Sequence, residues 1–143
     1  MLTVMLIAAG LVAVTVAIHA AGMGVVLSYL LKSHAVPPTR PWPITLLLVR
    51  VTLMLILIHA AEISVWALFY WWRGSLPDVE TAFYFSGATY TTIGYGDVVL
   101  AKPWRMLGPI EGMTGILMGG LSAGLFFATV SRIYAPRLEE RRP

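Results

Sequence analysis

The stretch from Thr91 to Asp97, Thr-Thr-Ile-Gly-Tyr-Gly-Asp, is the part of this chain whose residue types and spacing could do chemistry. Glycine has no Cβ, so Gly94 and Gly96 can adopt left-handed backbone angles that other L-residues avoid. Alternating such residues with ordinary ones turns successive carbonyl oxygens toward one axis. Those carbonyls, with the Thr92 hydroxyl, can replace the water shell of a dehydrated monovalent cation. The alternative is a surface turn between strands, which the long apolar segments on both sides disfavour.

The run from Thr92 to Asp97 resembles the selectivity-filter signature of the potassium channel family, in particular its small bacterial-type pore-loop channels. The resemblance covers roughly half of the chain, from its second apolar segment through its third. It implies a homotetramer around one pore, with K⁺ as the transported ion and no organic cofactor. The residues implied to form the K⁺-binding filter are Thr92, Ile93, Gly94, Tyr95 and Gly96, with K⁺ bound at the first four.

The residues flanking this filter are expected to support it. Asp97 is expected to hydrogen-bond behind the outer end of the filter. Thr91, which directly precedes the first filter residue, is expected to support its inner end. Some relatives place an acidic residue where this chain has Gly87 and Ala88, so another group must brace Asp97. Candidates for an aromatic cuff around the filter are Tyr84, Phe85, Tyr90 and Tyr95, for which ordinary core packing is an equally open interpretation.

The composition is that of a membrane protein with a single domain. Of 143 residues, 58 % are hydrophobic and 12 % charged, whereas soluble domains have about 25 % charged residues. The absence of cysteine excludes disulfides and thiolate metal sites. The net charge of +3 gives no sign of nucleic-acid binding. The chain has no Ser-x-x-Lys, phosphate-binding loop or His-Glu-x-x-His motif, so we do not expect an enzyme.

Long apolar runs predict an all-α membrane protein with three transmembrane helices, since a span needs about 20 apolar residues. Residues 1–31 form an additional first span of open role; a secretory signal would need a positive start and a shorter run. A proline-rich linker covers 32–43, and a basic tail covers 135–143. The pore domain, 44–134, is predicted to contain an outer helix at 44–72, a re-entrant pore helix at 78–91, the filter at 92–97 and an inner helix at 104–134.

Basic residues predict the orientation in the cell membrane. The linker carries Lys32 and Arg40 without an acid, and the tail is rich in arginine. We therefore expect the linker and tail in the cytoplasm, where the tail can contact lipid headgroups, and the N-terminus and pore loop outside. No span carries an arginine ladder that would sense voltage. Two alternatives to a K⁺-selective channel stay open: a non-conducting accessory subunit and a less selective cation channel.

The third apolar segment carries small residues at helical spacing. They indicate close helix packing, or a hinge in the pore-lining helix, for which Gly115 is the best match and Gly119 the rival. Phe126 and Phe127 could form a hydrophobic gate. The residues on the shared face are Gly108, Gly112, Gly115, Gly119 and Ala123.

Ionisable residues within the predicted spans form a second candidate constellation. His59 and Glu62 lie at i and i+3 on one helix face. They predict either a pH-sensitive pair or a buried hydrogen-bonded pair that ties helices together. His19 lies mid-span as well, so two histidines could bind a haem iron, or a metal together with Glu62 and Glu111.

Overall fold

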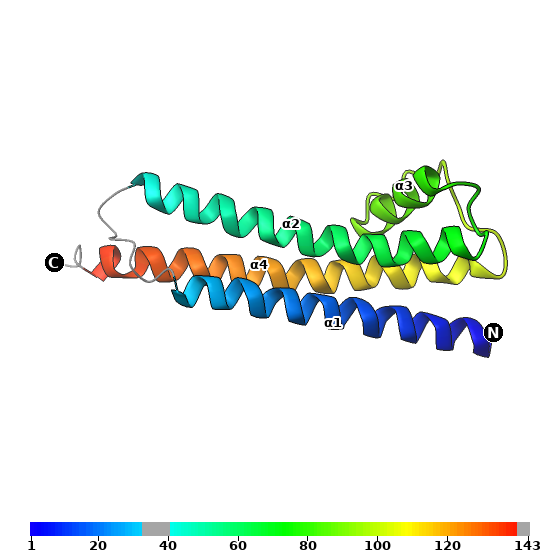
Figure 1. Cartoon of the computed structure of the whole chain (residues 1–143), viewed down its shortest axis with the longest axis horizontal. Coiled ribbons are helices and arrows are strands. Elements are labelled where there is room, and N and C mark those ends of the chain that lie inside the picture. Colours follow the sequence, from blue (N-terminus) through cyan, green and yellow to red (C-terminus); the bar gives the residue numbers. More distant parts are fainter. Residues whose placement is uncertain (33–40, 140–143) are drawn as a thin grey trace.

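The computed structural model describes residues 1–32 and 41–139 and contains three long helices and a short one (Figure 1). The three long helices lie side by side, and the short helix α3 lies obliquely at one end of them. The N-terminus lies at the end that carries α3, and α4 ends at the other. No strand occurs among the described residues, which confirms the predicted all-α class. The elements are α1 (Leu2–Lys32), α2 (Pro41–Trp72), α3 (Val79–Tyr90), the 3₁₀ turn η1 (Trp104–Met106) and α4 (Leu107–Glu139).

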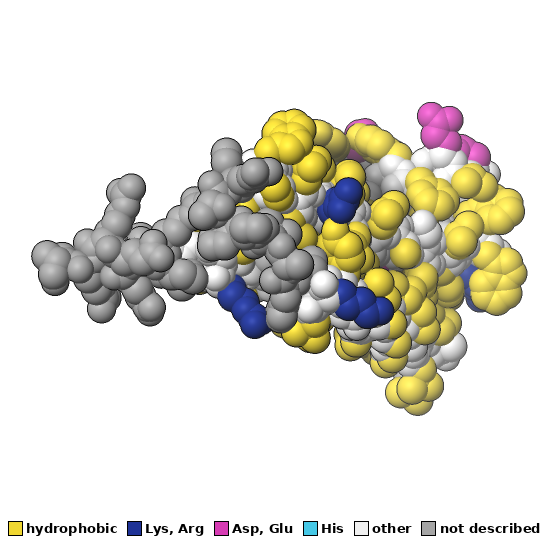
Figure 2. Space-filling model, turned by 60° about the vertical axis from the view of Figure 1, so that its left-hand side comes forward, with side chains coloured by type: hydrophobic (Ala, Val, Ile, Leu, Met, Phe, Trp, Pro, Cys, Tyr) yellow, Lys and Arg dark blue, Asp and Glu magenta, His cyan; other side chains and the backbone are white. Residues whose placement is uncertain are grey.

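Among the described residues, three helical segments are long and apolar enough to cross a membrane: Leu2–Lys32, Trp42–Trp72 and Trp104–Tyr134. At about 1.5 Å per residue each reaches roughly 45 Å, more than the ~30 Å hydrocarbon core, so each can cross it while tilted. Figure 2 shows hydrophobic side chains over much of the face in view. This apolar surface is what lipid or neighbouring helices would cover.

The helix ends differ from the predicted boundaries by a few residues. The outer helix begins at Pro41 instead of residue 44, because proline is tolerated in a first turn, where its missing N–H would have no intrahelical partner. The inner helix starts with η1 and continues to Glu139, into the predicted tail. Residues 33–40 of the predicted linker and 140–143 of the tail lie outside the described residues.

The pore helix α3 is defined by its caps. The Asp78 Oδ1 atom accepts a hydrogen bond from the Thr81 amide at 2.8 Å and caps the N-terminus. Thr91 is the C-cap, and its hydroxyl donates to the Gly87 carbonyl at 2.6 Å. Asp78 and Thr91, the two ends of the predicted pore helix, are therefore its capping residues.

Two apolar clusters hold the helices together. The first lies at the α3 end, where Tyr70 of α2 meets Phe85 of α3 edge-on, with ring centroids 5.4 Å apart. The second joins α1 and α2 and includes Val26 and Val51, both fully buried. A hydrogen bond from the Trp66 indole to the Thr15 hydroxyl, 3.0 Å long, adds a buried polar link between α1 and α2. The first span is thus packed on the outer helix.

A buried carboxylate joins α2, α3 and α4. Glu111 of α4 is fully buried and accepts hydrogen bonds from the Tyr70 hydroxyl, at 2.8 Å, and from the Ser86 hydroxyl. The Ser86 oxygen also lies 3.0 Å from the Ile63 carbonyl of α2. Ser86 therefore connects the pore helix to both of its neighbours.

Replacing Ser86 by alanine is expected to destabilise the fold by about 1–3 kcal/mol, because a buried carboxylate and a carbonyl lose a partner. Thermal unfolding in detergent measures the effect. Ser64→Ala is the matched control: Ser64 is half-buried, and its hydroxyl donates to the Ala60 carbonyl of its own helix, 2.7 Å away. Equal unfolding midpoints for the two variants would contradict the inference.

Candidate functional site

The backbone after α3 turns back on the last turn of that helix. The Thr92 amide donates to the Thr89 carbonyl, and the Gly94 amide donates to the Ala88 carbonyl, each at 3.0 Å. Positive φ angles then recur at every second residue: 63° at Thr92, 52° at Gly94 and 80° at Gly96. The two glycines have the left-handed angles expected of them. Thr92 adopts such an angle despite its Cβ, which the sequence did not predict.

The carbonyl groups of this segment are free of internal bonds. In the described part of the chain, no hydrogen bond ends on a carbonyl oxygen of residues 92–95, and residues 92–97 are exposed. The preceding helix α3 points its C-terminus, the negative end of its dipole, at the start of this segment. Unpaired carbonyls next to a negative helix end favour a cation.

Asp97 is braced by an aromatic side chain. Its Oδ2 atom accepts a hydrogen bond from the Tyr84 hydroxyl at 2.7 Å. The Tyr84 and Tyr95 rings are stacked, with centroids 6.4 Å apart and planes 7° from parallel. Tyr84 therefore provides the brace that Gly87 and Ala88 cannot. This hydrogen bond lowers the pKa of Asp97 and raises the pKa of Tyr84.

The other supporting residue, Phe85, faces the opposite way. It is buried and packs on Tyr70 in the cluster between α2 and α3. Tyr90 is also turned inward, toward Glu62, so it does not stack with Tyr95. Within one chain, the aromatic contact on the filter is made by Tyr84.

Tyr84→Phe is expected to raise the pKa of Asp97, because it removes the donor that stabilises the carboxylate. A lowered pKa in the folded protein means that this contact stabilises above the unfolded pKa and is lost as pH falls through the folded pKa. The variant should therefore unfold at a lower temperature than the wild type at neutral pH, and the difference should shrink in acid, well below the ordinary Asp pKa of about 3.9. Thermal scans at the two pH values test this. A difference that is the same at both would show that Tyr84 acts by packing alone.

The inner helix places the predicted hinge and gate residues in different surroundings. A Cβ on Gly115 would lie 1.9 Å from the Tyr90 carbonyl oxygen, so this glycine lets α4 approach the end of α3. A Cβ on Gly119 would have no atom within 4 Å. Phe126 packs against the α1–α2 cluster, whereas Phe127 is 73 % exposed.

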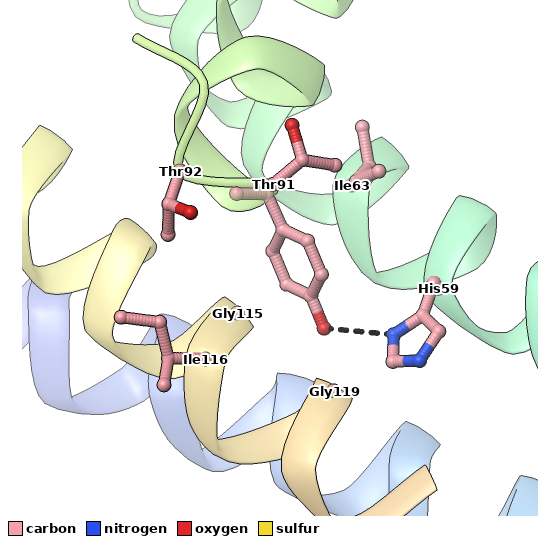
Figure 3. Close-up of a pocket in the computed structure, with 8 residues that line it drawn as sticks. His59, Ile63, Thr91, Thr92, Gly115, Ile116 and Gly119 are labelled. Carbon is pink, nitrogen blue, oxygen red and sulfur yellow. Dashed lines mark hydrogen bonds between the residues drawn. The ribbon is translucent and has the colours of Figure 1, made fainter. Parts of the chain in front are cut away.

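The ionisable residues of the spans separate into two groups. His59 and Glu62 are in contact, as their spacing predicts, and His19 of α1 bonds the same carboxylate. Glu111 instead binds Tyr70 and Ser86. A cavity of about 290 Å³ is lined by residues that include His59 of α2, Thr92 of the filter segment and Gly115 of α4 (Figure 3).

A family model described as an ion channel matches residues 44–132, more than half of the chain. The chain belongs to this ion channel family. No curated protein and no solved structure matches it. The matched region runs from α2 through the filter segment into α4 and leaves α1 outside. Together with three apolar helices, the match makes this channel a multi-pass membrane protein with a transport role.

Proposed function

We propose that the chain is one subunit of a homotetrameric, K⁺-selective channel that conducts passively. The observation that carries the proposal is the alternation of positive φ at Thr92, Gly94 and Gly96, next to carbonyls that accept no internal hydrogen bond. These carbonyls and the Thr92 hydroxyl bind K⁺ in place of its water shell, and ions move by knock-on between adjacent sites. Support for the channel class itself comes from the family match.

Several copies are needed for ion coordination, and the resemblance to potassium channels implies four. One chain supplies one row of oxygens, and a dehydrated ion needs oxygens on all sides. The filter side chains Ile93 and Tyr95 are 56 % and 70 % exposed in one chain, which leaves them free to meet neighbouring copies. A closed ring with cyclic symmetry satisfies both requirements.

We propose that the pore loop and the N-terminus face outward and that the C-terminus is cytoplasmic. The N-terminus lies at the same end as α3, and α4 ends at the opposite side (Figure 1). Basic residues of the linker and tail favour the cytoplasmic side for that opposite end. In this orientation Asp97 adds negative charge at the outer mouth.

A liposome flux assay tests the proposal. The purified protein is reconstituted with a K⁺ gradient, or with a matched Na⁺ gradient, and uptake is followed with a pH-coupled dye. Uptake driven by K⁺ and not by Na⁺ is the expected result. Equal uptake of both ions would favour a less selective cation channel. No flux from protein shown to be tetrameric would favour the accessory subunit.

A further inference from the structure

A cluster of ionisable side chains joins α1, α2 and the last residue of α3. His19 Nδ1 of α1 lies 2.8 Å from Glu62 Oε1, and His59 Nδ1 lies 3.1 Å from Glu62 Oε2, both residues belonging to α2. The Tyr90 hydroxyl of α3 donates to the same Oε2 atom and lies 3.1 Å from His59 Nδ1. Glu62 and His19 are 0 % and 2 % exposed. The carboxylate and the His19 imidazole are therefore enclosed by protein.

Among the described residues, no Lys or Arg pairs with the Glu62 carboxylate. The hydrogen-bond partners of the Glu62 carboxylate are two imidazoles and a phenol. With neutral partners, an ionised Glu62 leaves one negative charge buried between helices, which is costly without a compensating cation. Its ion pairs in the described chain are with His19 and His59 alone. A bound cation would complete the site.

The donor atoms suit a divalent transition metal. One ligand atom each from His19, His59 and Glu62 lie within 4.8 Å of one another. Imidazole nitrogen with carboxylate oxygen is a ligand set for zinc-like ions, bound at about 2.0–2.2 Å. Such a metal would draw these atoms together by small side-chain movements.

One outer contact and one unpartnered nitrogen favour metal binding over an ordinary polar core. His59 Nε2 lies 3.0 Å from the Ser122 hydroxyl of α4, the kind of outer contact that orients a metal-binding imidazole. The Nε2 atom of His19 is buried without a hydrogen-bond partner, so no protein acceptor holds a proton on this nitrogen.

An entry path is present on the side of His59. The cavity of about 290 Å³ is lined by His59 and Tyr90, and His59 is exposed over 23 % of its side chain (Figure 3). The dashed line in Figure 3 marks the bond from His59 to the tyrosine hydroxyl. An ion in this cavity would reach His59 first and then the carboxylate behind it.

We propose that His19, His59 and Glu62 bind one divalent transition-metal ion of the zinc class, with the Tyr90 phenol beside it. The ion would link α1 to the outer helix and to the last residue of the pore helix, which directly precedes the segment that begins at Thr91. The additional first span would then act as a metal-dependent brace of the pore.

The test is Co²⁺ binding to the purified full-length protein in detergent, read by visible absorption and by elemental analysis after gel filtration. One ion per chain, displaced by Zn²⁺, is expected. His19→Ala and Glu62→Gln should lose this binding. His34→Ala removes the third histidine of the chain and should leave it unchanged. No binding by the wild type, or tight binding retained by Glu62→Gln, would overturn the proposal.

A second variant separates loss of a ligand from loss of the fold. Ser122→Ala keeps all three ligands and removes the outer contact to His59, so we expect affinity about 10- to 100-fold weaker. If a ligand variant elutes differently from the wild type in gel filtration, its loss of Co²⁺ binding could reflect misfolding. In that case, unchanged Co²⁺ affinity in Ser122→Ala would overturn the proposed site. None of these measurements requires ion flux, so they succeed or fail independently of K⁺ conduction.

Discussion

Gly94→Ala should abolish K⁺-selective flux while the protein still assembles. Gly94 has φ of 52°, and a Cβ at this position would have no atom within 4 Å in the chain. The substitution therefore acts through the backbone: a left-handed angle costs a residue with a Cβ about 1–2 kcal/mol. In a tetramer all four filter segments would carry this conformational cost at the same level of the pore. The filter should relax to ordinary angles that turn carbonyls away from the axis.

Gly74→Ala is the matched control for this prediction. Gly74 has φ of 62° and likewise no neighbour within 4 Å of its Cβ position, but it lies in the loop after α2. Both variants should lose similar stability, measured by thermal unfolding. The liposome assay with K⁺ and Na⁺ gradients should separate them, since the selectivity of Gly74→Ala should match the wild type. Selective flux retained in Gly94→Ala would mean that the left-handed angle is not what orients the carbonyls.

The parts of this fold that local chemistry specifies could be predicted from the sequence. Apolar length defines the spans, Asp78 marks the start of the pore helix, and Gly94 and Gly96 indicate left-handed backbone. Each of these signals lies within a few residues of the feature that it determines. The left-handed angle at Thr92 has no such signal, because it follows from how the chain turns back on α3.

The contacts between helices could not be predicted in the same way. His59 and Glu62 share a face because both lie on α2, but nothing local indicates that His19 of α1 meets the same carboxylate. The axial register of two helices determines this contact. The partners of Glu111 were missed for the same reason: Tyr70 and Ser86 come from two other helices. Polar residues in separate spans indicate that some contact exists between helices, but they do not show which residues form it.

Gly115→Ala should be among the most damaging small substitutions in the inner helix. Its Cβ would lie 1.9 Å from the Tyr90 carbonyl oxygen and 2.9 Å from the carbonyl carbon, both of them backbone atoms that cannot rotate away. The inner helix must then move away from the end of the pore helix, and overpacking of this kind costs about 1–3 kcal/mol. Because Tyr90 precedes Thr91 and Thr92, we expect both the unfolding midpoint and K⁺ flux to fall.

Gly119→Ala distinguishes packing from hinge motion, because Gly119 lies one turn further along the same helix and has open space around its Cβ position. Alanine in a helix interior is more stable than glycine by about 0.5–1 kcal/mol, so its unfolding midpoint should hold or rise. If α4 bends at Gly119, flux should fall in this variant without any loss of stability. If both variants keep wild-type stability, the close approach of Gly115 to Tyr90 is not a constraint on the fold. A stability loss confined to Gly115→Ala would assign that glycine to packing against the pore helix and would leave Gly119 as the position where the inner helix can bend.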